Sequence, residues 1–213
     1  LYLADLSEDE ALELADLVGG NALGTIGGTV RSGRQLASAA PDPGPGMAGP
    51  YEVANRVYLR SLWAGEALAS VLQFHDSPAV RARVMEWSSR ISSLKTTIVE
   101  DIGVEIGSVA TGEFGAALDT RVPARLTRGP LDFDLPASAL EPDAADWYGS
   151  SDFPLSGNAR FELVNFIDGE RSVTDIRNAL SAEFGPVPTA AVARYLEDLV
   201  EVGVVEWAYS SEG

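Results

Sequence analysis

The chain has 213 residues, enough for one ordinary domain or two small ones, and 46% of them are hydrophobic, so a folded core is expected. It carries 32 acidic against 15 basic side chains, a formal net charge of -17. This acidity disfavours binding to nucleic acid and to anionic membrane surfaces, because both are negatively charged. The absence of cysteine and the presence of one histidine exclude disulfides, thiolate chemistry and a metal centre built on several histidines.

The N-terminal segment is predicted to begin with a helix. Ser7 and Glu10 match a capping box, and several leucines follow with roughly helical spacing. We expect Gly19 and Gly20 to end this helix, because glycine adopts the left-handed conformation of a C-cap. The next stretch is rich in small residues, and residues 41–50 are a linker by their Pro and Gly content.

A long antiparallel αα-hairpin is predicted for residues 51–118. Two apolar stripes with near-helical period are separated by a turn at 76–78, and the second runs from Val80 to Val109 in steps of three and four. Helices joined by such a short turn should pack against each other. The near-heptad spacing predicts a second helix over residues 78–109.

Three side chains of this hairpin yield specific expectations. Trp87 and Ile91 lie in the middle of the second stripe, so we expect both to be buried against the helix of 51–75. His75 lies at the turn beside Asp76. We interpret it as an exposed bystander near a helix C-terminus rather than as a metal ligand or a general base.

Residues 119–154 lose the helical period and are predicted to form an extended arm, because four prolines lie between 123 and 142. Trp147, Tyr148 and Phe153 are close together in this arm. Such an aromatic trio can serve as a ligand platform. We interpret it instead as a plug that docks the arm on a neighbouring domain.

The C-terminal module, residues 155–209, is predicted to contain three short helices and a terminal strand. Asn158, Ser172 and Thr189 are the expected caps of the helices. The alternating, β-branched and aromatic residues from Val204 onward predict the strand. The sequence thus divides into an N-terminal segment (1–40), a linker (41–50), a hairpin (51–118), an arm (119–154) and this module (155–209), and we expect a mainly α protein.

The sequences FELVNFIDGERSVTDIRNALSAEFG and VARYLEDLVEVGVVEW, within residues 158–207, resemble the small winged-helix modules of the peptide-chaperone type. Together with RVPARLTRGPL at 121–131, they are similar to the non-catalytic tail of bacterial zinc aminopeptidases of the M28 class. The resemblance spans roughly residues 51–208. It implies a C-terminal winged-helix domain with a short β wing, and a secreted protein, periplasmic or extracellular.

The resemblance implies an accessory region without catalytic or metal residues of its own, since zinc would belong to a separate catalytic domain. The expected partner is that domain or a peptide, bound through Val204, Val205 and Trp207 at the strand edge. DNA binding is not expected, because residues 155–209 contain nine acidic side chains and only four arginines. The alternative is a stand-alone peptide-binding or structural assembly protein, including a homo-oligomer.

Overall fold

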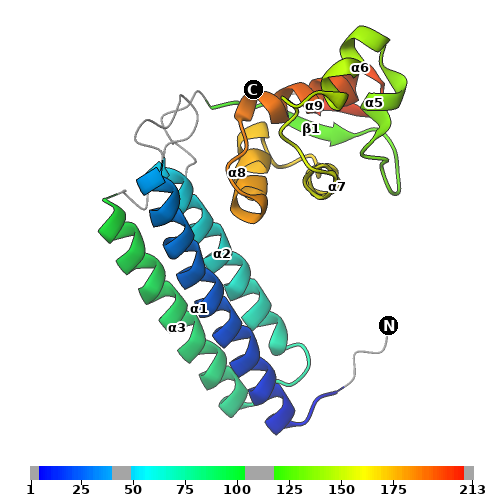
Figure 1. Ribbon diagram of the computed structural model, residues 1–213. Helices are drawn as coiled ribbons and strands as arrows, with labels where there is room; N and C mark the ends of the chain where they lie inside the picture. Colours follow the sequence, from blue (N-terminus) through cyan, green and yellow to red (C-terminus); the bar gives the residue numbers. More distant parts are fainter. Residues whose placement is uncertain (1–4, 40–48, 104–117, 209–213) are drawn as a thin grey trace, which may run out of the picture. The chain divides into compact units, whose positions relative to one another are not determined.

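The computed structural model describes residues 5–39, 49–103 and 118–208, with side chains placed for 5–31 of the first range, and shows a mainly helical protein (Figure 1). The chain divides into two compact units, of which the first is built by α1 to α3 and the second by the elements from β1 onward. Along the chain the elements are α1 (Glu8–Ala39), α2 (Gly49–Val71), α3 (Pro78–Ile102), β1 (Val122–Arg125), α5 (Leu135–Ala139), α6 (Pro142–Gly149), α7 (Gly157–Asn165), α8 (Val173–Phe184), α9 (Thr189–Glu201) and β2 (Val205–Ala208).

The first unit is a bundle of three long helices (Figure 1), in which α1 packs against both α2 and α3. Its core is a seam of small and branched residues: Ala11, Ala15, Ile26, Val57, Leu68, Val71, Val80, Ile91, Ile98 and Val99. The two helices of the hairpin expected from the sequence therefore pack together with a third helix, α1. The small alanines of α1 allow its backbone to approach the other two helices closely.

The expectation that Gly19 and Gly20 end the first helix is wrong, because α1 continues for 32 residues through both glycines to Ala39. The predicted capping box is present: the Ser7 amide donates to Glu10 Oε2, and the Glu10 amide donates to Ser7 Oγ. A glycine inside a helix costs about 1 kcal/mol relative to alanine. Packing of α1 against two neighbours offsets that cost here, as tertiary contacts commonly do.

The expected helix over 78–109 ends earlier in the structure. Ser77 caps α3 and accepts a hydrogen bond from the Val80 amide, with Pro78 at the first helical position. At the other end Gly103 adopts φ 75, the left-handed conformation that closes the helix at Ile102. Val109 lies outside the described residues.

Two side-chain expectations for the hairpin need correction. Ile91 is buried, but Trp87 is only half-buried and lies against Gly19 of α1. His75 is not an exposed bystander: it is half-buried, and its Nδ1 lies 2.9 Å from the Leu6 carbonyl oxygen. Both differences follow from α1, whose position in the bundle the apolar periodicity of the hairpin did not reveal.

The second unit packs α7, α8 and α9 around its own core of Leu163, Ile176, Leu180, Val192, Tyr195, Leu196, Leu199 and Val205. Ser172 caps α8 as predicted, and it forms a capping box with Asp175. Two other caps differ from expectation, because Ser156 rather than Asn158 caps α7, and α9 begins after Pro188 without a side-chain cap from Thr189. Among the described helices, none is long and apolar enough to cross a membrane.

The segment 119–154 is not simply an extended arm. It contributes β1, which pairs antiparallel with the terminal strand β2, and the two short helices α5 and α6. The pairing joins residues far apart in the sequence, with Val122 opposite Ala208 and Arg125 opposite Val205. Sequence patterns within each segment cannot reveal such a long-range pairing, because each strand contains only four residues.

Candidate functional site

The two-stranded sheet of the C-terminal unit presents two unlike outer edges. The Leu126 amide donates to the Val204 carbonyl at 3.0 Å, just beyond the paired residues. Hydrogen-bonded and non-hydrogen-bonded pairs alternate along an antiparallel ladder. The pairs 124–206 and 122–208 are therefore hydrogen-bonded, and the amide and carbonyl groups of Val205 and Trp207 point away from β1.

Of the two residues with outward groups, Trp207 is half-buried and Val205 is only 1% exposed, so the unpaired edge of β2 is accessible at Trp207. Within the described part of the chain, no strand pairs with this side of β2. The opposite edge of the sheet is different, because Pro123 lies opposite Trp207 and has no N–H where an added strand would need a donor. The β2 edge has a main-chain donor and acceptor at both outward positions, of which those of Trp207 are the less buried.

The side chains around the β2 edge are held by the core and by charge. Val205 is buried, Trp207 is half-buried against the same core, and Glu206 on the other face is exposed. The Arg121 guanidinium lies 4.5 Å from the ring centre of Trp207, which fixes the indole by a cation–π contact.

Arg121 is itself held in place by two acidic side chains. It forms salt bridges to Asp119 at 2.5 Å and to Glu197 of α9 at 2.8 Å. The hydrogen bonds to Asp119, and then to Glu197, raise the pKa of Arg121 above its ordinary value. The hydrogen bond from Arg121 in turn lowers the pKa of Asp119. Through Arg121, the indole of Trp207 is thus linked to Asp119, just before β1, and to Glu197 of α9.

The structure brings the aromatic trio of the arm together. The ring centres of Trp147 and Phe153 are 4.8 Å apart, and those of Tyr148 and Phe153 are 5.0 Å apart, each pair edge-to-face. Tyr148 also contacts Tyr195 of α9, with ring centres 6.2 Å apart. This geometry ties α6 and the following loop to α9 within one unit.

Polar contacts complete this aromatic cluster. The Tyr148 hydroxyl donates a short hydrogen bond to the Asp198 carboxylate of α9. Burial, followed by this hydrogen bond, raises the pKa of Tyr148 above its ordinary value. The Arg194 guanidinium lies 4.1 Å from the ring centre of Trp147. These rings are half-buried and pack against one another and against α9.

The predicted site residues thus fall into two places. Val204 precedes β2, and Val205 and Trp207 lie on it, while Trp147, Tyr148 and Phe153 form the cluster on α9. Sequence reasoning missed Pro123 and Arg121 as parts of the site. The residue pattern provided only a weak indication of a strand here, because Pro123 lies between a valine and an alanine in a segment whose composition is typical of a loop.

In the ranges 5–31, 49–103 and 118–208, no group of three or more His, Asp or Glu side chains could hold a metal ion. Comparison with protein-family models, with curated proteins and with solved structures finds no match to this chain. The fold and the site define a helical protein with a small sheet that has one open edge.

Proposed function

We propose that the C-terminal unit is a peptide-binding module of the winged-helix type, which receives an extended peptide as an added strand beside β2. The observation that carries this proposal is the outward-facing main-chain N–H and C=O of the half-buried Trp207 on the unpaired side of β2, opposed by a proline on the other edge. Main-chain hydrogen bonds supply the affinity in such strand addition, and side-chain pockets supply the selectivity.

The charge of the unit suggests which peptides bind. Glu206 is exposed on β2, and Glu201 is exposed near the end of α9. Carboxylates near the edge favour a peptide with basic side chains over an acidic one, because charge complementarity increases the association rate and disfavours like-charged partners.

In the protein as a whole this module acts as a non-catalytic accessory region of an M28-like peptidase, according to the sequence resemblance of residues 51–208. The chain itself then carries no catalysis, and the zinc belongs to a separate catalytic domain in the periplasm or outside the cell. Metal analysis of the purified chain is expected to find no stoichiometric zinc, and bound zinc at one equivalent would contradict this role.

Amide hydrogen exchange tests the strand-addition proposal directly. Peptides of about 12 residues would be selected from a random displayed library on the purified chain. The amide of Trp207 should exchange fast in the free protein and slowly with the peptide bound. The amides of Glu206 and Ala208 point to β1 and should be protected in both states.

The matched control is the same peptide with alternate main-chain nitrogens methylated, which removes the donors on one side and should abolish binding. A selected peptide that binds without slowing exchange at Trp207 would place the binding site elsewhere and contradict the proposal.

A further inference from the structure

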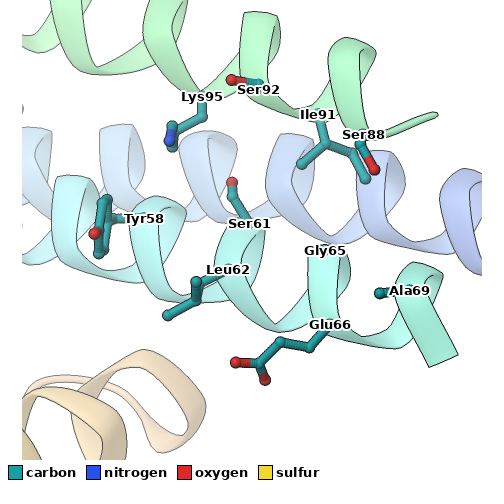
Figure 2. A pocket seen from close by; sticks show the side chains of 10 residues that line it. All are labelled: Tyr58, Ser61, Leu62, Gly65, Glu66, Ala69, Ser88, Ile91, Ser92 and Lys95. Carbon is teal, nitrogen blue, oxygen red and sulfur yellow. The ribbon is translucent and has the colours of Figure 1, made fainter. Parts of the chain in front are cut away.

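A groove of about 380 Å³ runs between α2 and α3 in the N-terminal unit (Figure 2). Small residues recur four apart along both of its walls: Ser61, Gly65 and Ala69 on α2, and Ser88 and Ser92 on α3. In Figure 2 Ser61 and Ile91 point into the space between the two helices, and α1 passes behind it. Another helix could approach the backbones closely along such a groove.

One exposed apolar side chain, Leu62, lines the groove, and a second, Met85, lies elsewhere on α3. Leu62 on α2 is 48% exposed, and Met85 on α3 is 71% exposed. Met85 lies seven residues before Ser92, so the two share one face of α3. Ile91 forms the buried floor. An exposed large apolar side chain beside a concave surface is a common feature of association sites.

The two walls carry opposite charges. Glu66 lines the groove from α2 and Lys95 lines it from α3, and Lys95 is the only lysine of the chain. The Lys95 ammonium lies 5.4 Å from the ring centre of Tyr58, on the same groove. Among the described residues, neither Glu66 nor Lys95 forms a salt bridge.

We propose that this groove is a homodimer interface, with a second copy of the chain as its occupant. A two-fold axis exchanges identical surfaces, so each residue of one copy meets the counterpart of its own contact on the other. An axis through the groove, midway between Glu66 and Lys95, places each glutamate against the lysine of the second copy. The surface is therefore complementary to itself in charge.

The size of the face suits a stable dimer. α2 and α3 contain 23 and 25 residues. At a rise of about 1.5 Å per residue each is roughly 35 Å long, and two adjacent helices about 20 Å wide present roughly 700 Å². Stable interfaces bury about 800 Å² on each partner. This inference concerns the N-terminal unit and does not depend on peptide binding at β2.

Charge reversal on the full chain tests the proposal. Light scattering should give twice the chain mass of 22.5 kDa for the parent protein. Glu66→Lys and Lys95→Glu should each raise the dimer dissociation constant about tenfold, because each sets two like-charged pairs face to face. The double variant Glu66→Lys/Lys95→Glu should restore the parent affinity, which no loss of folding can mimic.

Glu13→Lys is the matched control, since it makes the same charge change at an exposed position of α1 outside the groove. Because the chain has no cysteine, Leu62→Cys also allows a short bis-maleimide to link two copies, whereas Glu13→Cys should not be linked. A monomeric parent at 100 µM, or single reversals that dimerise as well as Glu13→Lys does, would overturn the proposal.

Discussion

The indole of Trp87 lies directly on the backbone of Gly19, so close that a Cβ at Gly19 would lie 2.2 Å from Trp87 Cδ2. The same indole donates from Nε1 to Asp16 Oδ1 at 2.7 Å, one turn earlier on α1. Asp16 also accepts from Arg83 at 2.5 Å. These contacts lock α1 to α3 at the point where the sequence suggested that the first helix would end.

Gly19→Ala should destabilise the N-terminal unit. The added methyl group overlaps the Trp87 ring, and neither the helix backbone nor the packed indole can move freely, so the expected cost is about 1–3 kcal/mol. Gly20→Ala is the matched control, because nothing lies within 4 Å of its Cβ position. It should instead stabilise the helix by up to about 1 kcal/mol. Urea unfolding of both variants measures the difference, and equal effects would contradict the close contact.

Trp87→Ala and His75→Ala should differ in the same assay. The tryptophan variant loses the packing on Gly19 and the bond to Asp16, and we expect a loss of about 3 kcal/mol. The histidine variant loses one hydrogen bond to the Leu6 carbonyl, which is typically worth about 1 kcal/mol. Thermal melts of both variants rank the two losses. A neutral His75→Ala would show that the contact to Leu6 contributes nothing to stability.

Asp16 should make part of the stability depend on pH. The hydrogen bond from Arg83, and then that from Trp87, lowers the pKa of Asp16 below its ordinary 3.8. The unfolded chain therefore takes up the proton first. The contribution of Asp16 is fully present above its ordinary pKa and is lost as the pH falls through 3.8 and then through the lower native value.

Asp16→Asn should flatten the fall in the free energy of unfolding below about pH 5, while remaining less stable than the parent at neutral pH. The change should be modest, because the Asp16 side chain is 45% exposed and solvent screens its charge. Urea unfolding from pH 7 to pH 3 provides the measurement. Glu13→Gln, on the exposed face of α1, is the control and should leave the profile unchanged.

Tyr148→Phe should destabilise the C-terminal unit by about 1–3 kcal/mol, because it leaves the nearly buried Asp198 carboxylate without its hydroxyl donor. Asp198→Asn should cost less, since an amide still accepts from the hydroxyl. A double-mutant cycle with both changes measures the coupling between the two groups. Additive losses would indicate that the hydrogen bond contributes little.

Local sequence patterns were sufficient for several elements of this protein. The capping boxes at Ser7 and Ser172, the Ser77-Pro78 start of α3 and the terminal strand after Val204 all follow from short-range rules. These features depend on residues within three or four positions of each other. The mainly helical class follows from the same periodicity.

What only the tertiary structure decided are the contacts between distant segments. Local propensity favoured a helix stop at Gly19, and the packing of α1 on α3 overrode it, because a whole helix face outweighs about 1 kcal/mol. The pairing of β1 with β2 likewise decides which main-chain groups of the sheet face outward. Pro123 removes a donor from the β1 edge only because it lies opposite Trp207 in this register. The sequence of a four-residue strand does not indicate which distant segment will pair with it. The unpaired edge is therefore determined only when the two segments come together in the folded protein.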